Sequence, residues 1–260
     1  MPATDLELLI DAARAAGKVA LGYAGPQARR WDKPDGAGPV TEADLAVNDL
    51  LHDTLRTARP DYGWLSEETE DSDDRLSRER VFIVDPIDGT RSFAEGSSTW
   101  AHAIAVAERG VVTAGVVYLP KRDLMYVAAT GQGATVNGKP LKPSQTHDLD
   151  SAEILANRPS MAEANWRGGK IPSFTRAYRP SLAYRMATVA EGRFDGMITL
   201  HPCWEWDIAA GELILREAGA LCTDKTGATP IFNNAHPTIN GLVAGGREIH
   251  SLLRAGLRPS

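Results

Sequence analysis

Asp85-Pro86-Ile87-Asp88-Gly89-Thr90 is the stretch around which the rest of the chain is organised. It follows the apolar run Val81-Phe82-Ile83-Val84, which predicts a buried β-strand that ends where the acidic residues begin. Pro86 fixes its own backbone angle, and Gly89 allows a ligand to approach the main chain closely. Two carboxylates on a short, stiff turn are oxygen ligands of the kind that Mg²⁺ prefers. The same residue types are ordinary turn formers, so the motif alone fits a purely structural turn equally well.

Composition restricts the class of protein. The 260 residues are 43% hydrophobic, enough to bury a large core in one big domain or two modest ones. The net charge is -6 and Lys and Arg are spread along the chain, which argues against a nucleic-acid partner. Cys203 and Cys222 are too few for a disulfide framework and fit a reducing compartment. Without a basic leader or a membrane-spanning apolar run, we expect a cytoplasmic protein that does not contact the membrane.

The first 148 residues predict two helices followed by neighbouring strands. Apolar residues at helical spacing indicate one helix over residues 6–19 and another that begins near Thr41. Between them, a Gly/Pro-rich stretch over 25–39 is typical of a mobile surface loop. Strands are expected at 63–66, 81–84, 99–107, 111–119 and 124–129. This order predicts an antiparallel sheet with helices packed on it.

Residues 149–260 alternate short strands and helices, which predicts a second α/β half packed on the first. Strands are expected at 154–156, 194–200, 221–222 and 242–244, and helices at 181–190, 207–218 and 248–257. The polar stretch from Ser144 to Asp150 separates the two parts. We therefore expect domains 1–148 and 149–260 that form one compact catalytic unit.

Further acidic residues lie at the boundaries of predicted elements. Glu67 and Glu68 end the strand over 63–66, and Asp207 opens a helix. Asp44 follows Thr41 by three residues, which is the spacing of a capping box, so on spacing alone a structural cap is the favoured interpretation. Each site taken singly has such a structural explanation. The six histidines fall at no metal-ligand spacing and are expected to be surface or packing residues.

Taken together, these motifs resemble the inositol monophosphatase family of metal-dependent, lithium-sensitive phosphatases. The resemblance rests on Trp64-Leu65-Ser66-Glu67-Glu68, on the stretch 85–90 and on Trp206-Asp207-Ile208-Ala209-Ala210-Gly211, and it extends over nearly the whole chain. It implies an α/β (α+β) fold, an αβαβα layered sandwich with an N-terminal antiparallel sheet and a smaller C-terminal mixed sheet. The active site then lies between the two halves. Homodimers are common in the family, so a homodimer is an expectation here.

The resemblance also implies a set of metal ligands. Glu67, Asp85 and the main-chain carbonyl of Ile87 correspond to ligands of a first Mg²⁺. Asp85, Asp88 and Asp207 correspond to ligands of a second, with Asp85 bridging the two. A third, weaker metal near Glu67 is common in the family. Two metals roughly 3.5–4 Å apart can clamp a phosphate between an activated water and the leaving oxygen.

Catalytic and phosphate-binding roles follow from the same resemblance. Thr90 and Asp44 are expected to orient and deprotonate the attacking water, and Glu68 to assist. The N–H groups of Gly89 and Thr90, at the start of a short helix, are expected to hold phosphate oxygens beside Asp88. No Cys, Ser or His nucleophile is needed.

One position departs from the inositol-specific pattern. Inositol monophosphatases place a glutamate seven residues before the aspartate of the Trp-Asp motif, where it binds inositol hydroxyls. In this chain that position is Leu200, which cannot accept such hydrogen bonds. Inositol is therefore a less favoured substrate.

Other stretches resemble bacterial 3'(2'),5'-bisphosphate nucleotidases, which hydrolyse the 3'-phosphate of adenosine bisphosphate. They are Asp88-Gly89-Thr90-Arg91-Ser92-Phe93, Pro180-Ser181-Leu182-Ala183-Tyr184-Arg185 and Pro202-Cys203-Trp204-Glu205-Trp206-Asp207. Arg179, Ser181 and Tyr184 are accordingly expected to face a nucleotide, although Arg91 and Arg179 fit ordinary surface cations equally well. Trp204 is expected to pack in the core rather than to stack on a base.

Three hypotheses about function remain open at this point. The first is the bisphosphate nucleotidase. The second is a phosphatase for inositol-1-phosphate or another small phosphorylated metabolite, such as histidinol phosphate or fructose bisphosphate. The third is a non-catalytic relative that binds metal or a partner protein, against which the intact set of acidic residues argues.

Overall fold

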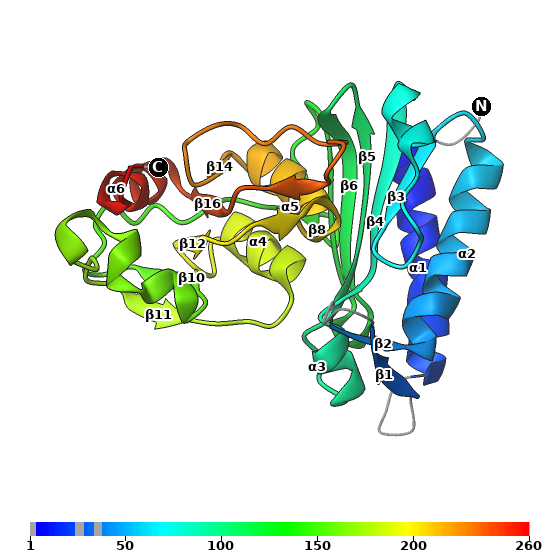
Figure 1. The fold of residues 1–260 in the computed structure, drawn as a ribbon, viewed down its shortest axis with the longest axis horizontal. Coiled ribbons are helices and arrows are strands. Elements are labelled where there is room, and N and C mark those ends of the chain that lie inside the picture. The colour runs from blue at the N-terminus through cyan, green and yellow to red at the C-terminus, as the bar shows by residue number, and fades with distance from the viewer. Residues whose placement is uncertain (1–3, 24–28, 34–37, 260) are drawn as a thin grey trace.

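The computed structural model of the protein describes residues 4–23, 29–33 and 38–259. Its helices and sheets alternate in layers, which Figure 1 shows from right to left as a helix pair, a large sheet, a second helix pair, a smaller sheet and an outer helix. This order confirms the αβαβα sandwich predicted from the sequence. Within the described part of the chain, we find no helix with the length and hydropathy needed to cross a lipid bilayer.

The large sheet has seven strands in the order β3-β4-β5-β6-β7-β8-β9. β3 runs parallel to β4, and all the other neighbouring pairs are antiparallel. The predicted antiparallel sheet therefore has one parallel strand at its edge. The strands are β3 (Gly63–Ser66), β4 (Arg80–Asp88), β5 (Ala101–Glu108), β6 (Val111–Leu119), β7 (Leu124–Ala129), β8 (Ala134–Val136) and β9 (Lys139–Pro140).

One face of the large sheet is covered by α1 (Asp5–Tyr23) and α2 (Glu42–Ala58) (Figure 1). Leu9 of α1 belongs to the same buried cluster as Phe82 of β4, whereas Ile83 of β4 belongs to the cluster on the opposite face. Successive side chains of a strand point to opposite faces, so β4 is buried on both sides. This burial explains why its sequence is a continuous apolar run.

The second helix pair, α4 (Leu182–Ala190) and α5 (Glu205–Ala218), lies between the two sheets (Figure 1). A Cβ added at Gly115 of β6 would lie 3.2 Å from the Cα of Ala210 in α5, so glycine permits close contact between strand and helix here. Leu213 of α5 is fully buried in a cluster that includes residues of both sheets. The ranges 1–148 and 149–260 thus each contain one of the two larger sheets, and residues of both ranges share this core.

The smaller sheet has five strands in the order β11-β10-β12-β16-β14. β10 is parallel to β11 and β12, and β16 is antiparallel to β12 and β14, so this sheet is mixed, as predicted. α6 (Arg247–Gly256) covers its outer face, where Leu253 packs in one cluster with Val243. The strands are β10 (Glu153–Ala156), β11 (Thr175–Ala177), β12 (Gly196–Thr199), β14 (Leu221–Thr223) and β16 (Leu242–Gly245).

Shorter elements complete the described chain. Two small antiparallel pairs join β1 to β2 and β13 to β15, and α3 is a five-residue helix. These elements are β1 (Arg30–Asp32), β2 (Pro39–Thr41), β13 (Cys203–Trp204), β15 (Thr238–Ile239), α3 (Thr90–Ala94) and the 3₁₀ helices η2 (Asp73–Ser77), η3 (Pro120–Arg122), η4 (Pro159–Met161), η5 (Glu163–Asn165) and η6 (Arg167–Gly169).

Two sequence-based expectations about local structure were wrong in part. The stretch 25–39 contains β1 and the first residue of β2, while residues 24–28 and 34–37 lie outside the described chain. β4 does not end at Val84, because pairing with β5 continues as far as Asp88. The acidic residues that were assigned to a turn are therefore part of the strand.

Candidate active site

Three carboxylates meet where β4 ends and α5 begins. Asp85 and Asp88 come from β4, and Asp207 comes from the first turn of α5. One oxygen from each lies within 4.8 Å of the other two. Asp85 is 1% exposed and Asp88 is 6% exposed, whereas Asp207 is half-buried, so the cluster is largely shielded from solvent.

Burial is the main reason why the pKa values of these carboxylates are raised. The pKa of Asp88 is raised to about 6, and those of Asp85 and Asp207 lie well above their usual range. Repulsion from neighbouring carboxylates raises the last two further. Such a group is stable when it is protonated or when a cation neutralises it.

The donor set fits a hard divalent cation. Oδ1 of Asp85 is buried and has no hydrogen-bond partner among the residues that the structure describes. An unpaired buried carboxylate oxygen is costly, and a metal ion would satisfy it. Carboxylate oxygens are the ligands that Mg²⁺ takes in proteins. Asp85, Asp88 and Asp207 are therefore the residues that could hold a metal.

A β-bulge brings Asp85 and Asp88 to the same place. Asp85 pairs with Ala103 and Asp88 with Ala101, so two residues of β4 lie opposite the single residue His102 of β5. The bulged segment is held by a hydrogen bond between the carbonyl of Pro86 and Nδ1 of His102. His102 is fully buried, and burial lowers its pKa to about 4, so the ring is neutral and Nδ1 donates. From the sequence alone, His102 is expected to be an ordinary surface or packing residue.

The second half of the chain holds Asp88 in place. The hydroxyl of Ser181 donates to Oδ2 of Asp88 at 2.6 Å, and the backbone N–H of Ala183 donates to the same oxygen at 2.6 Å. Ser181 is also the N-cap of α4 and accepts from the backbone N–H of Tyr184 at 3.0 Å. The N-terminus of α4 thus binds a carboxylate of β4. Ser181 was expected to face a nucleotide, but its hydroxyl is engaged within the protein.

Asp44 and Thr90 meet beside this cluster. The hydroxyl of Thr90 lies 3.0 Å from Oδ1 of Asp44 and 3.1 Å from the carbonyl oxygen of Ile87. Burial is the largest cause that raises the pKa of Asp44 to about 6. Gly89, with a φ of 96°, turns the chain from β4 into α3, a conformation that favours glycine. The carboxylate, the hydroxyl and the carbonyl named from the resemblance are therefore brought together.

Glu67 and Glu68 follow β3 and are bound by a lysine that sequence analysis did not assign. Nζ of Lys33 lies 2.9 Å from Oε1 of Glu67 and 2.7 Å from Oε1 of Glu68. Glu67 lies outside the group of three carboxylates within 4.8 Å, although its charge is the largest Coulombic contribution to the raised pKa of Asp85. Burial raises the pKa of Glu68 to about 7. No local sequence signal connects Lys33 to Glu67, which lies 34 positions away.

The residues expected to bind a nucleotide differ in their accessibility. Arg179 is half-buried, and its guanidinium lies over the ring of Phe194 at 5.0 Å. Tyr184, in contrast, is fully buried, and its hydroxyl accepts hydrogen bonds from Arg122 and Arg193. The side chain of Tyr184 is therefore packed inside the protein, which corrects the expectation that it faces a substrate.

Arg185 is a buried cation close to the acidic site that sequence analysis did not single out. It is 6% exposed, and its guanidinium donates to the carbonyl oxygens of Arg179 and Pro180. Asp88 and Asp207 are among the carboxylates whose charges act on it. A positive charge beside the carboxylate cluster thus orders the chain that leads into α4.

Trp204 does not pack in the core, contrary to expectation. It is 42% exposed and stacks on Trp206, with the ring centroids 4.7 Å apart and the planes inclined by 8°. The ring of His236 meets its edge at 5.5 Å. Trp206, the residue directly before Asp207, therefore supports the exposed ring of Trp204.

A layered αβαβα fold thus holds, between its halves, a cluster of three carboxylates that could bind a metal ion. A family model described as "Inositol monophosphatase family" matches residues 2–259. The chain belongs to the inositol monophosphatase family, whose members depend on metal, and it is a phosphatase.

Individual relatives agree with this assignment. The chain is 32% identical to the Nus factor SuhB of Escherichia coli strain K12 over 263 residues, covering 97% of this chain and 95% of that protein. It is also 32% identical to the inositol-1-monophosphatase of Mesorhizobium japonicum over 270 residues, covering 98% and 96%. Each comparison spans nearly the full length of both proteins.

Solved structures show the same fold. An IMPase of Thermotoga maritima superposes with a TM-score of 0.81 at 27% identity, covering 96% of this chain and 94% of that one. SaIMPase-II crystallised with bound 2'AMP superposes with a TM-score of 0.80 at 25% identity, covering 95% and 91%. The same SaIMPase-II has also been crystallised with inositol monophosphate.

Proposed function

We propose that this phosphatase is a Mg²⁺-dependent 3'(2'),5'-bisphosphate nucleotidase, which hydrolyses adenosine 3',5'-bisphosphate to AMP and phosphate. The observation that carries the phosphomonoesterase part is the buried group of Asp85, Asp88 and Asp207 next to the hydrogen-bonded pair Asp44 and Thr90. Hydrolysis needs both parts. The three carboxylates would hold the cation that binds the phosphate, and the pair of Asp44 and Thr90 would receive a proton from water.

Four features support a nucleotide rather than an inositol phosphate. Leu200 offers no hydrogen-bond acceptor for inositol hydroxyls. Arg179 is a half-buried cation that could pair with a second phosphate, and the stacked surface of Trp204 could receive a base. SaIMPase-II, a structural neighbour, has been crystallised with bound 2'AMP, so this fold can accept an adenosine phosphate.

The metal ligands that we propose are the three clustered carboxylates together with Glu67 and one main-chain carbonyl. We assign Glu67, Asp85 and the carbonyl of Ile87 to one Mg²⁺ and Asp85, Asp88 and Asp207 to another, with a third near Glu67. When bound, these ions supply positive charge to the phosphate and lower the pKa of a water molecule. The N–H groups of Gly89 and Thr90 are assigned to phosphate oxygens.

The protein itself handles the proton. Thr90 donates its hydroxyl hydrogen to Oδ1 of Asp44, which leaves a lone pair on Thr90 Oγ1 to accept a hydrogen bond from water. With its pKa raised to about 6, Asp44 is a stronger base than an exposed aspartate and is still ionised at neutral pH. Glu68, with a pKa of about 7, is a second proton acceptor at the same site.

A phosphatase for inositol-1-phosphate or another sugar or histidinol phosphate is the alternative. The identity to the inositol-1-monophosphatase of Mesorhizobium japonicum favours it. Measurement of kcat/KM with both substrates in Mg²⁺ decides between them. We expect phosphate release from adenosine 3',5'-bisphosphate to exceed that from inositol-1-phosphate, and the reverse ranking would reject the nucleotidase assignment. An Asp88→Asn variant assayed in parallel controls for contaminating phosphatases.

We also propose three properties that the family resemblance implies, namely inhibition by Li⁺, a homodimeric state and a cytoplasmic location. Millimolar Li⁺ should inhibit the enzyme, and a dose–response series in Mg²⁺ with K⁺ as the control salt measures this. We also propose a homodimer that acts on small metabolites in the cytoplasm. Light scattering of the purified protein tests the oligomeric state, and a monomer at micromolar concentration would contradict it.

A further inference from the structure

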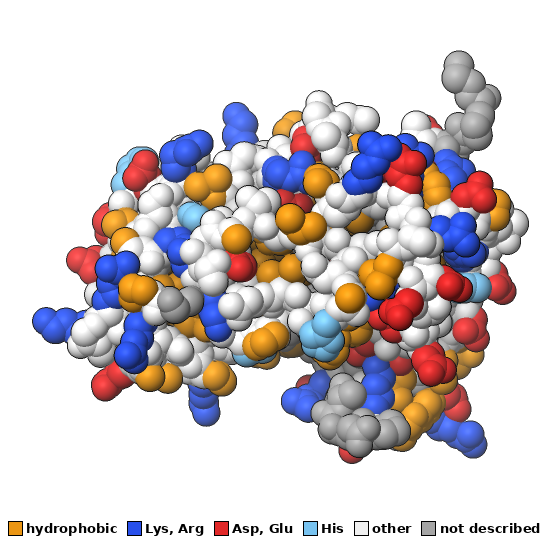
Figure 2. Space-filling view, turned by 45° about the horizontal axis from the view of Figure 1, so that its top comes forward, with side chains coloured by type: hydrophobic (Ala, Val, Ile, Leu, Met, Phe, Trp, Pro, Cys, Tyr) orange, Lys and Arg blue, Asp and Glu red, His pale blue; other side chains and the backbone are white. Residues whose placement is uncertain are grey.

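The outer end of the C-terminal half carries a concentration of positive charge. Arg167, Lys225, Arg254 and Arg258 line adjoining hollows around the C-terminal segment. Two of these hollows have volumes of about 200 Å³ and about 300 Å³. Figure 2 shows several Lys and Arg side chains near the left end of the molecule, which is the end where Figure 1 places α6.

These cations have no acidic partners within the described chain, where every ion pair involves other basic residues. Arg254 donates to the carbonyl oxygens of Lys225 and Thr226, and Arg167 donates to the carbonyl oxygen of Leu257 at 3.0 Å. These bonds join the loop after β14 and the η6 segment to the C-terminal end. Arg254 and Arg167 therefore shape the hollow.

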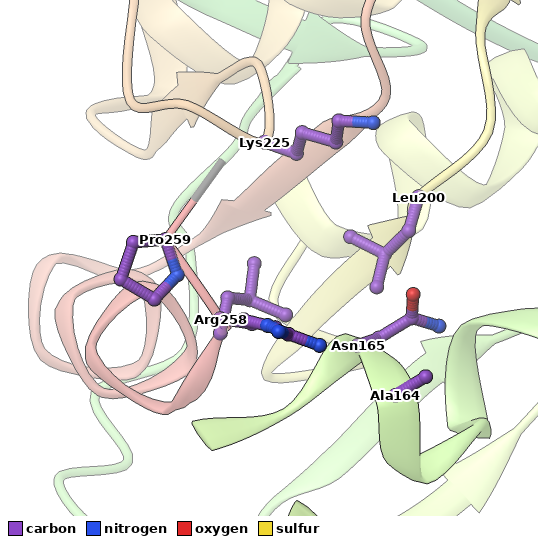
Figure 3. Close-up of a pocket in the computed structure, with 7 residues that line it drawn as sticks. Ala164, Asn165, Leu200, Lys225, Arg258 and Pro259 are labelled. Carbon is purple, nitrogen blue, oxygen red and sulfur yellow. The ribbon is translucent and has the colours of Figure 1, made fainter. Parts of the chain in front are cut away.

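The side chains of Lys225 and Arg258 remain without a hydrogen-bond partner among residues 4–23, 29–33 and 38–259. Both line the two measured hollows, and Lys225 is half-buried. Figure 3 shows Arg258 extending from the C-terminal segment toward Asn165, with Lys225 above and Leu200 across from it. The position of Arg258 is set by its backbone N–H, which donates to the carbonyl oxygen of Asn165 at 2.9 Å.

The other residues that line the smaller hollow with Lys225 and Arg258 are uncharged, and the nearby carboxylate of Asp224 is already hydrogen-bonded. The remaining walls of the smaller hollow are formed by Ala164, Asn165, Leu200, Leu257 and Pro259. The carboxylate of Asp224, next to Lys225, accepts hydrogen bonds from Thr226 and Ala228 in its own turn. Glu163 lines only the third, adjoining hollow.

We propose that this hollow, which we name the C-terminal hollow, binds the dianionic phosphate group of a small metabolite, with Lys225 and Arg258 as its charged ligands. Half-buried Lys225 and exposed Arg258 line the same hollow, and an ammonium and a guanidinium match a phosphate by charge. The apolar walls suit the uncharged body of a phosphorylated metabolite better than free phosphate. Asp85, Asp88 and Asp207 do not line the hollow, and the side chain of Leu200, one of its walls, packs against the apolar cluster under α6, so this is a second site that goes beyond the proposed hydrolysis.

Calorimetric titration of the full-length protein with inorganic phosphate tests the proposal. It is run with Mg²⁺ and again after removal of divalent ions by EDTA. The carboxylate cluster without metal repels phosphate, so binding that remains in EDTA reports the C-terminal hollow. We expect one site in EDTA, and we expect Lys225→Gln and Arg258→Gln each to weaken it about tenfold. Lys139→Gln, which removes an exposed cation of β9, is the matched control.

Two further titrations identify the ligand. AMP and adenosine are compared in EDTA, and tighter binding of AMP than of phosphate would show that the apolar walls contact the rest of a metabolite. Equal binding of AMP and phosphate would assign the site to free phosphate and overturn the choice of a metabolite. Absence of binding in EDTA, equal affinity of the Gln variants and wild type, or adenosine binding as tightly as AMP would each overturn the site itself. Unfolding temperatures of all variants verify that the fold is retained.

Discussion

Oγ1 of Thr90 lies 3.0 Å from Oδ1 of Asp44, while Oδ2 of the same carboxylate accepts hydrogen bonds from the backbone N–H and the hydroxyl of Thr41. One oxygen completes the capping box of α2, and the other accepts the hydrogen bond from Thr90. From the sequence, capping and catalysis were alternatives, with capping favoured. The two oxygens of one side chain allow both.

Asp44→Asn should separate these two roles. An amide oxygen can keep one of the two contacts but cannot take a proton, so we expect kcat to fall by about 10²–10⁴. Loss of the cap should cost about 1 kcal/mol of stability at most. Thr41→Ala is the matched control, because it weakens the cap by a similar amount and leaves the contact with Thr90. Kinetics and denaturant unfolding of both variants measure this, and equal activity losses would contradict a proton-accepting role.

Asp88→Asn tests the metal assignment. The amide can still accept from Ser181 and from the N-terminus of α4, so the fold should be retained. One negative charge is lost from the group of three, and turnover should therefore become undetectable. Circular dichroism checks the fold, and Asp148→Asn, at an exposed position, serves as the control. Activity close to wild type would eliminate the two-metal assignment.

We expect the protein to bind protons when Mg²⁺ is removed and to release them when Mg²⁺ is added again. In the metal-free protein, the raised pKa values of Asp85, Asp88 and Asp207 mean that the folded chain holds protons that the unfolded chain releases above about pH 4. Stability of the metal-free protein should thus fall as the pH rises from about 4 through these raised pKa values. Mg²⁺ binding should release these protons and restore stability.

Calorimetry in buffers of different ionisation enthalpy measures this proton release. We expect more protons to be released near pH 6, close to the pKa of Asp88, than near pH 8.5, where Asp88 is already ionised. Mg²⁺ affinity should rise across the same interval. The Asp88→Asn variant should release fewer protons near pH 6. An affinity independent of pH would show that these groups do not bind the ion.

Lys33→Gln should strengthen Mg²⁺ binding. The ammonium of Lys33 neutralises Glu67 and Glu68, and under the proposed metal assignment it competes with a metal ion for Glu67. Removing this positive charge should raise Mg²⁺ affinity about fivefold, equivalent to ~1 kcal/mol, and less at high salt. Titration at two salt concentrations, with Lys139→Gln as the control, checks this. A weaker or unchanged affinity would show that Lys33 does not compete for Glu67.

Much of the fold was predictable because its signals are local. Helical periodicity located α1, α2 and α5, and the apolar run before Asp85 located the centre of the large sheet. The pairing of β4 with β5 was not visible in the sequence. Pairing decides where a strand ends, so the stretch from Asp85 to Asp88 became a bulge instead of a turn.

The chain by itself determined the acidic residues at element boundaries, the family that their order indicates and the layered architecture. These depend on residue types and spacing along the chain. The tertiary structure alone decided how the Asp85–Thr90 stretch is held, because His102, Lys33 and Ser181 reach it or its acidic neighbours from distant segments. Ser181 contacts Asp88 across 93 residues. Hydrogen bonds between such segments depend on packing and leave no periodic trace in the sequence, which explains why they emerge only from the folded protein.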